Sequence, residues 1–179
     1  RTAFDLVLTL IPSPLLEVVC QVIEPKYTIF ATWPAAKTYH HAWLGGLLEH
    51  SVEVARIALD IAAPTWDGSV NYAPTAVIYD NRIRRWPTVD VGLLLAAALL
   101  HDVGKMAEFV VGASTSYSDA GQSLGHIHLG LFMVRDACDL FRLDPFDSGR
   151  LLHLIASHHG VPEYGSAIRP MTSEALILN

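Results

Sequence analysis

The sequence predicts an all-helical, single-domain protein, a helical bundle with room for one small β-hairpin insertion near residues 76–86. The chain has 179 residues, which is the size of one domain and enough to bury a sizeable core. Hydrophobic residues make up 51% of it and charged residues only 17%, so we expect a packed globule and exclude a disordered chain. Several segments repeat apolar residues at helical spacing, and Pro or Gly separates them.

The first half of the chain contains two predicted helical regions. Residues 6–23 are expected to form one or two short helices, because Pro12 and Pro14 interrupt the pattern. From residue 47 to residue 62 the apolar side chains recur with a helical period, and Pro64 ends the helix that they predict.

An insertion is expected after this second helical region. Pro, Gly, Asn and Asp punctuate residues 63–87, a composition that helical domains tolerate between helices. Within the insertion, residues 76–79 and 82–86 can pair as a hairpin about Asp80 and Asn81.

The second half begins with the strongest helical signal. Residues 91–100 are apolar on all sides and rich in Leu and Ala, which predicts a central buried helix. Gly104 is expected to stop the chain from continuing as a helix. Residues 114–125 are expected to form a polar loop, and a helix is expected from His126 to about Phe141.

Two more helices complete the predicted bundle. Asp147 and Ser148 are expected to cap a helix over residues 149–159, which Gly160 ends. A last helix is expected from residue 172 or 173, and its apolar pattern runs to the end of the chain. Because the first residue is also not Met, we expect the chain to be a fragment of a longer protein.

Charge and cysteine content limit the function classes. The formal net charge of -6 gives no general attraction to nucleic acid or to anionic lipid, so a polyanionic substrate needs a metal or a few placed cations. Two cysteines do not make a disulfide framework in a chain this long. This indicates a protein of a reducing cellular compartment. No targeting segment and no apolar run long enough to span a bilayer is visible. We therefore expect a cytoplasmic protein without a membrane partner.

The histidines indicate a metal site. Most of the nine lie at the ends of predicted helices, and His101-Asp102 ends the most apolar one. A charged Asp at the mouth of a hydrophobic core costs several kcal/mol unless it is paired or bound to a metal. Imidazole and carboxylate are good ligands for Mn, Fe or Zn. Two ions about 3.5–4 Å apart could activate a water and stabilise an in-line phosphoryl displacement.

These residues also carry a family resemblance. His50, His101-Asp102 with Gly104-Lys105, His126 and His158-His159 resemble the HD superfamily of metal-dependent phosphohydrolases, which implies an HD-domain helical bundle. A finer resemblance, to the HD domain of YhaM-type 3′-to-5′ exoribonucleases, extends from about Pro34 to the end of the chain. It rests on these motifs: Pro34-Ala-Ala-Lys37 with His40-His41, Gly46-Leu47-x-x-His50, His101-Asp102-Val-Gly-Lys105, Leu124-Gly125-His126-Ile127, and Ser157-His-His-Gly160 with Glu163.

The resemblance implies roles for individual residues. The implied metal ligands are His50, His101, Asp102 and His126, with Asp102 as the bridging carboxylate. His158 and His159 would complete the second metal site or border it. Asp102 and Lys105 would be the catalytic residues, with Lys105 also meeting a substrate or leaving phosphate as a point charge. His40 and His41 would bind substrate. The implied cofactors are divalent ions, two of them, Mn or Fe, with Zn, Co or Ni as alternatives.

Some polar residues have a simpler interpretation. His153 is expected to be a structural histidine, and His128 has no counterpart in the family pattern. Glu49 and Glu53 are expected to form a solvated helix face, although Glu49 could support His50. Arg169 is as well explained by a structural ion pair as by a phosphate contact with the substrate.

The sequence departs from the family in two respects. HD domains usually close their site with a further Asp, which would lie a few residues beyond the position of Leu178 and outside this chain. The exoribonucleases also carry an OB-type domain, and nothing here matches it. We therefore expect a helical lead-in at residues 1–33, a catalytic core at 34–179 whose last helix is truncated, and additional domains in the full-length protein.

Three functions and one inactive alternative remain open. The resemblance implies a phosphodiesterase that hydrolyses single-stranded RNA or oligonucleotides from the 3′ end. HD domains act on many substrates, so a nucleotide or cyclic-nucleotide phosphohydrolase is an alternative. The HD domain of a conjugative relaxase is another, because such DNA-processing proteins share the Gly-Gly-Leu-Leu-x-His and His-Asp-Val-Gly-Lys motifs. A degenerate fold kept as a scaffold is a minority interpretation.

Overall fold

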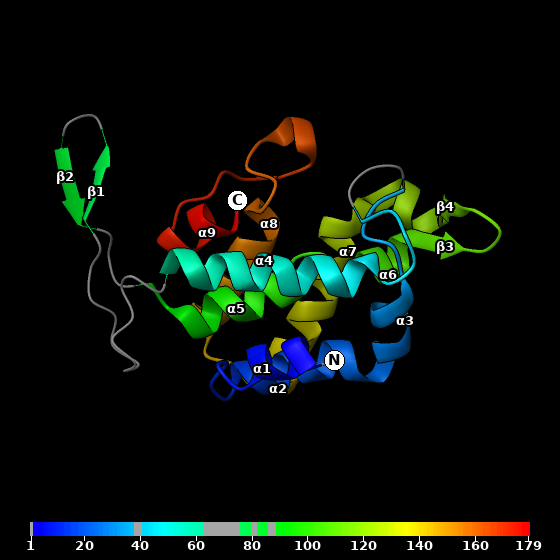
Figure 1. Ribbon diagram of the computed structural model, residues 1–179, viewed down its shortest axis with the longest axis horizontal. Helices are drawn as coiled ribbons and strands as arrows, with labels where there is room; N and C mark the ends of the chain where they lie inside the picture. Colours follow the sequence, from blue (N-terminus) through cyan, green and yellow to red (C-terminus); the bar gives the residue numbers. More distant parts are fainter. Residues whose placement is uncertain (1, 38–40, 63–75, 80–81, 86–88) are drawn as a thin grey trace.

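The computed structural model describes residues 2–37, 41–62, 76–79, 82–85 and 89–179, and these form a helical bundle with two hairpins (Figure 1). The helices are α1 (Thr2–Leu8), α2 (Leu15–Ile23), the 3-10 turn η1 (Glu24–Lys26), α3 (Tyr27–Thr32), α4 (Gly46–Ala62), α5 (Val91–Leu100), α6 (Lys105–Glu108), α7 (Asp119–Leu140), α8 (Pro145–Ser157), the 3-10 turn η3 (Pro162–Tyr164) and α9 (Ser173–Leu178). The strands are β1 (Ala76–Tyr79), β2 (Arg82–Arg85), β3 (Phe109–Val111) and β4 (Thr115–Tyr117). The predicted fold class is confirmed.

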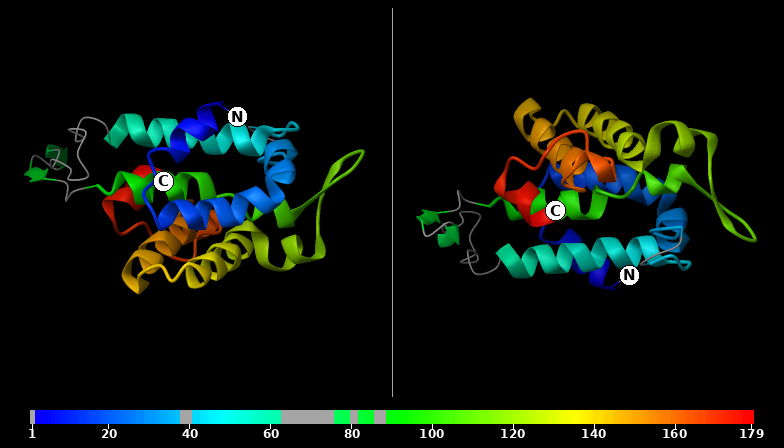
Figure 2. Two further views of the ribbon diagram at one scale, coloured as in Figure 1. Left: turned by 90° about the horizontal axis from the view of Figure 1, so that it is seen from below. Right: turned by 90° about the horizontal axis from the view of Figure 1, so that it is seen from above.

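Helix α5 forms the centre of the core. Every residue from Val91 to Leu100 is buried, and the helix packs against α2, α4, α8 and α9. Figure 2 shows α4 on one side of α5 and α7 with α8 on the other. A helix that is apolar on all sides can be surrounded in this way without burying polar groups. Asp90 caps its first turn by accepting a hydrogen bond from the Leu93 N–H at 3.0 Å.

The N-terminal helices belong to the same hydrophobic core as the rest of the bundle. Helices α1 and α2 are separated by residues that include Pro12 and Pro14, as the sequence predicts. Helix α2 packs against α5 and α7, and α3 packs against α4. Neither Cys20 nor Cys138 forms a disulfide. No helix in the described ranges is both long and apolar enough to cross a membrane.

The two hairpins lie at opposite ends of the molecule (Figure 1). Strands β1 and β2 pair antiparallel with Ala76 opposite Arg85, which confirms the predicted hairpin; its Asp80-Asn81 turn and Trp86 lie outside the described residues. Strands β3 and β4 pair with Phe109 opposite Tyr117. This second hairpin was not predicted, and it extends beyond the helices in Figure 2.

The prediction of a polar loop over residues 114–125 is wrong. This stretch contains β4 and the beginning of α7. Ser118 caps α7 by accepting a hydrogen bond from the Gly121 N–H at 2.9 Å. The backbone leaves the helical conformation at Gly125, where φ is 70°, so α7 consists of two helical segments, 119–124 and 126–140. The predicted start of a helix at residue 126 is therefore the start of the second segment.

The predicted cap of α8 is also wrong. The helix begins at Pro145 rather than at residue 149, and Asp144 caps it by accepting a hydrogen bond from the Phe146 N–H at 2.9 Å. Proline is favoured at the first helical position because its missing N–H would have no intrahelical partner there. Asp147 lies inside the first turn of α8 and pairs with Arg150.

An ion-pair network joins α8 to the first turns of α5 and α9. The Arg150 guanidinium of α8 lies 3.3 Å from Asp90 Oδ2 before α5, 3.2 Å from Asp147 Oδ1 and 3.1 Å from Glu174 Oε1 of α9. The buried Glu174 carboxylate also accepts the Asp90 N–H at 2.9 Å. Arg150 therefore neutralises a carboxylate that would otherwise be buried without a cation.

We expect Arg150→Met to lower the free energy of unfolding by about 1–3 kcal/mol. The change removes the cation beside the buried Glu174 carboxylate, while Met keeps most of the volume of the Arg150 side chain. Urea denaturation followed by circular dichroism measures this loss. The matched control is Arg135→Met, which removes an exposed pair with Asp136 and should leave the denaturation midpoint unchanged. Equal losses in the two variants would show that the buried network adds no stability.

Candidate metal centre

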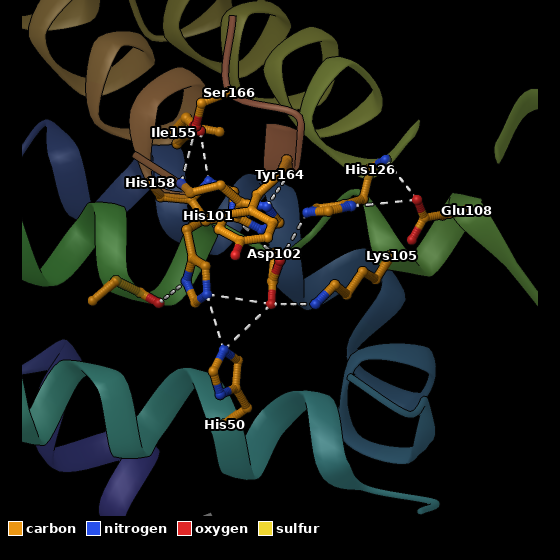
Figure 3. A network of polar contacts seen from close by, with 12 residues as sticks. His50, His101, Asp102, Lys105, Glu108, His126, Ile155, His158, Tyr164 and Ser166 are labelled. Carbon is orange, nitrogen blue, oxygen red and sulfur yellow. Dashed lines mark hydrogen bonds and ion pairs between the residues drawn. The ribbon is translucent and has the colours of Figure 1, made fainter. Parts of the chain in front are cut away.

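Histidines from opposite sides of the bundle converge on Asp102. Figure 3 shows His50 of α4 reaching Asp102 from one side and His126 of α7 and His158 after α8 reaching it from the other. Asp102 follows directly after α5 and is 1% exposed. The predicted ligand residues are thus brought together because α4 and α8 pack on α5, while α7 packs on α6 and α8.

The two oxygens of Asp102 face different groups. Oδ2 lies 3.4 Å from His50 Nε2, 3.3 Å from His101 Nε2 and 2.6 Å from Lys105 Nζ. Oδ1 lies 3.3 Å from His126 Nε2 and 3.7 Å from His158 Nε2. One carboxylate therefore stands between two sets of imidazoles. We call these sets the Oδ2 side and the Oδ1 side.

Backbone carbonyls orient three of the imidazoles. His101 Nδ1 lies 2.9 Å from the Ala98 carbonyl oxygen, His158 Nδ1 lies 2.7 Å from that of Ile155, and His159 Nδ1 contacts that of Tyr164. A carbonyl oxygen can only accept a hydrogen bond, so each Nδ1 is the donor. The lone pair of a neutral imidazole is then on Nε2, the nitrogen that a metal at the centre would bind.

Burial keeps several of these imidazoles neutral. It lowers the pKa of His50 to about 4, with a smaller contribution from His101. Burial and the neighbouring His101 also lower the pKa of His158, and burial lowers that of His159. Neutral imidazoles at neutral pH are ready to act as ligands without first losing a proton.

Asp102 is ionised in spite of its burial. Burial alone would raise the pKa of its carboxyl, but His101 and Lys105 hold the pKa well below its usual value. Lys105 lies one turn beyond Asp102, and its ammonium group is mostly buried at the edge of the centre. The centre thus combines an ionised carboxylate with the neutral imidazoles of His50, His158 and His159.

Buried polar atoms without partners mark a place for a cation. In the described part of the chain, Asp102 Oδ1, His126 Nε2 and His158 Nε2 are buried and have no hydrogen-bond partner. Leaving such atoms unpaired costs free energy, and a cation on the Oδ1 side would be bound by all three. Two groups have ligand atoms within 4.8 Å of one another: Asp102, His126, His158 and His159; and His50, His101 and Asp102. These donors fit a divalent transition metal.

Gly104 allows the turn after α5 to approach α7. A Cβ atom at this position would lie 1.9 Å from the carbonyl oxygen of His126 and 2.6 Å from the Gly130 nitrogen. No side chain fits in that space, so only glycine allows the contact. The contact places Asp102 beside His126. The prediction that Gly104 ends the helix is wrong, because α5 already ends at Leu100 and Gly104 lies directly before α6.

The residues expected to bind substrate have different outcomes. His40 lies outside the described residues. The His41 ring lies 5.3 Å from the His50 ring, and its Nε2 is 3.3 Å from Glu53 Oε2. Arg169 is exposed after η3, and within the described ranges it pairs with no member of the centre.

Three other polar residues have local partners. His153 Nε2 accepts the Met171 N–H at 3.0 Å, and His128 Nδ1 lies 2.9 Å from the Leu124 carbonyl oxygen, so both contact the backbone as non-ligand residues would. Glu49 accepts a hydrogen bond from Trp43 Nε1 at 2.9 Å, so the expectation that it could support His50 finds no contact among the described residues.

Two polar residues that support the histidines were not singled out for that role from the sequence. Glu108 is 7% exposed, and its Oε1 lies 3.3 Å from His126 Nδ1. Ser166 is 1% exposed, and its hydroxyl accepts the His159 N–H at 3.1 Å. The sequence contains only a weak signal for Glu108: it precedes the apolar Phe109 and follows the His-Asp motif by a few residues, which is compatible with a buried carboxylate near the centre.

With this geometry in place, comparison with known proteins identifies the family. Residues 47–179 match the HD domain family. The chain belongs to the HD-domain family. The matched range includes all the histidines that converge on Asp102.

The HD domain is also similar to curated exoribonucleases. It is 34% identical over 150 residues to the 3'-5' exoribonuclease YhaM of Bacillus licheniformis, covering 84% of this chain and 41% of that protein. It is 35% identical to YhaM of Bacillus subtilis, with the same coverage of both chains. For YhaM of Bacillus velezensis the identity is 32% over 168 residues, covering 93% of this chain and 47% of the relative.

The chain thus spans less than half the length of these curated relatives. No solved structure matches it. An HD domain with relatives of this kind is a hydrolase domain, as the sequence motifs predict.

We expect Gly104→Ala to destabilise the domain by about 1–3 kcal/mol, because the added methyl group overlaps the His126 carbonyl oxygen and must push α6 from α7. Thermal unfolding of the purified protein measures the loss. The matched control is Gly149→Ala in α8, where a Cβ meets nothing within 4 Å and Ala should stabilise the helix by about 0.5–1 kcal/mol. A neutral Gly104→Ala would show that the close approach is not required.

Proposed function

We propose that this HD domain is a metal-dependent phosphodiesterase that degrades single-stranded RNA or oligonucleotides from the 3′ end. The observation that carries the proposal is the buried Asp102 carboxylate, whose two oxygens each face a separate set of imidazoles. The substrate class is supported by the similarity to proteins named as 3'-5' exoribonucleases. Because the chain covers only part of those proteins, further domains would supply much of the RNA affinity.

The chain's own residues divide the work at this site. We assign His50, His101 and Asp102 as ligands of one divalent ion and Asp102, His126, His158 and His159 as ligands of a second. Mn or Fe are the proposed ions, and Zn, Co or Ni have compatible ligand preferences. Such ions supply Lewis acidity toward water and phosphate oxygens. Asp102 bridges the two sets and holds the negative charge that attracts the cations.

Lys105 adds a fixed positive charge at the Oδ2 side. Its ammonium lies 2.6 Å from Asp102 Oδ2, and its side chain is 14% exposed. An ammonium group acts toward phosphate as a point charge, so Lys105 would offset the charge of a phosphate that enters beside Asp102 or leaves from it. The other predicted anion contact, Arg169, lies in an exposed loop and remains a weaker proposal.

Exposed aromatic residues near the centre favour a substrate that contains bases. The Trp43 side chain is 52% exposed, and its ring lies 4.9 Å from that of His41, which is next to His50. Its indole N–H is held by Glu49, so the ring has a defined orientation. Bases of single-stranded nucleic acid stack on such rings with little dependence on sequence. We therefore propose that Trp43 and His41 contact the substrate beside the reacting phosphate.

We expect Asp102→Ala to lower the hydrolysis rate by more than about 100-fold, since groups that only support metal ligands already contribute about 10- to 100-fold. The assay is digestion of a 5′-end-labelled single-stranded RNA in the presence of Mn²⁺, resolved by length, in which the wild type should give a ladder that shortens from the 3′ end. Asp139→Ala changes an exposed Asp of α7 and serves as the control.

Retained activity in Asp102→Ala would exclude the proposed metal role. Cleavage of mononucleotides or cyclic nucleotides in preference to RNA would instead favour the alternative phosphohydrolase. Circular dichroism of each variant before the assay separates loss of chemistry from loss of fold.

We expect Trp43→Ala to raise KM for an oligonucleotide by about 5- to 150-fold and to change kcat much less, because one stacked base contributes about 1–3 kcal/mol of binding. Steady-state kinetics on a short oligonucleotide measure the two constants. Trp43→Phe should retain part of the binding. Phe146→Ala is the control, since this exposed ring lies at the start of α8, the opposite end from His158. A fall in kcat alone would place Trp43 in the chemistry rather than in substrate binding.

A further inference from the structure

Glu108 is a buried carboxylate that contacts a histidine of the centre. It is the last residue of α6 and is 7% exposed. Its Oε1 accepts the backbone N–H of His126 at 2.9 Å and lies 3.3 Å from Nδ1 of the same residue. Figure 3 shows it on the side of the His126 ring that faces away from Asp102. The His126 imidazole is thus placed between two carboxylates.

The break in α7 makes the backbone contact possible. At Gly125 the chain has φ 70° and ψ 163°, so a new helical segment starts at His126. The first N–H groups of a helical segment have no intrahelical partner, and the start of the segment favours a negative charge. Glu108 provides both the acceptor and the charge. It therefore fixes the position of the His126 backbone as well as its ring.

The backbone around Glu108 is itself held in place. Its N–H donates to the Gly104 carbonyl oxygen at 2.9 Å, and its carbonyl oxygen accepts the Ser118 N–H at 2.8 Å. A Cβ on Gly121 would lie 2.3 Å from that same oxygen, so the first segment of α7 packs directly on it. A carboxylate held in this way can orient a ligand without the cost of ordering a mobile side chain.

Glu108 also gives the two sides of the centre different charge. Nδ1 of His101, His158 and His159 faces a neutral backbone carbonyl, whereas Nδ1 of His126 faces a carboxylate. A carboxylate partner makes the opposite nitrogen of an imidazole a stronger donor to a metal. The Oδ1 side therefore has this added negative charge, while the Oδ2 side has the Lys105 ammonium 2.6 Å from its carboxylate oxygen.

We propose that Glu108 is a positioning residue for metal binding: it holds His126 with Nε2 toward Asp102 Oδ1 and makes the Oδ1 side the tighter of the two metal sites. The inference rests on the proposed function, because it takes His126 to be a ligand. Glu108 does not touch the metal or the substrate, and its effect passes through His126.

Calorimetric titration of the metal-free protein with Mn²⁺ alone tests this inference. Glu108→Gln is the informative variant, because one oxygen makes both contacts to His126 and the Gln carbonyl oxygen can keep them while the charge is lost. We expect this variant to weaken the tighter Mn²⁺ binding step by about 10- to 100-fold. In a His126→Ala background the same change should have little further effect.

The matched control is Glu174→Gln, which neutralises another buried carboxylate that accepts a backbone N–H but lies in the Arg150 network. It should lower stability and leave the Mn²⁺ affinity unchanged. The visible absorption spectrum of the Co²⁺-loaded protein gives a second readout, and it should change in Glu108→Gln and not in Glu174→Gln. Both variants are checked for cooperative unfolding before the titration.

The outcomes distinguish a failure of the inference about Glu108 from a failure of the proposed metal centre. Wild-type affinity and an unchanged Co²⁺ spectrum in Glu108→Gln would show that Glu108 only caps the helical segment, which overturns the inference and leaves the proposed function intact. No Mn²⁺ binding by the wild-type protein would overturn the proposed metal centre and the inference with it. An equal loss of affinity in Glu174→Gln would show that general destabilisation, rather than the contact with His126, lowers the binding.

Discussion

The rest of the structure depends on the burial of one negative charge, that of Asp102, directly after the most apolar helix. A carboxylate is costly to bury, and this one is 1% exposed, so the surrounding elements must bring positive charge or metal ligands to it. Lys105 provides one cation through a contact within a single turn. Lys105 faces only Oδ2, however, and the Oδ1 atom is left with imidazole nitrogens and no hydrogen-bond donor among the described residues. Packing brings α4 and α8 against α5 and brings α7 against α6, and it thereby places the histidines at this charge.

The sequence was sufficient for the elements that carry a strong local signal. Helix α5 could be predicted because its apolar residues continue around the whole helix, and α4 because its apolar residues keep one period. The sequence did not predict the early start of α7, since the first segment of α7 is held by the cap at Ser118 and by contact between Gly121 and the Glu108 backbone. For α8 the sequence contains a start signal, an Asp followed by Pro145, but the Asp147-Ser148 pair three residues later has the same capping chemistry and misplaces the predicted start.

Most of the candidate site could be predicted for a related reason. The histidines lie at helix ends next to apolar stretches, a place where an unpaired polar residue is unfavourable, so their positions indicate a shared partner. Glu108 lacks such a signal, because it lies in a helix of four residues and its importance comes from a contact eighteen positions along the chain. Arg169 is a different case: its nearness to His159 in sequence suggests a role in the site, and in the structure it is exposed, so its contact with substrate stays a prediction. Sequence position identifies a ligand that ends a helix far better than a residue that supports that ligand.

The position of the centre would also link the proposed metal binding to the stability of the bundle. His50 comes from α4, His101 from the end of α5, His126 from α7 and His158 from the end of α8. A cation bound by residues from several helices acts as a crosslink, because the ligands come together only when those helices are packed. Its binding energy therefore adds to the free energy of folding. The two Asp102 oxygens differ in how much a bound cation would stabilise them. On the Oδ2 side Lys105 already offsets the charge of the carboxylate. On the Oδ1 side the buried Asp102 oxygen and histidine nitrogens have no hydrogen-bond partner among the described residues. The Oδ1 side thus has more to gain from a cation, and it is the side to which α7 and the end of α8 contribute their histidines.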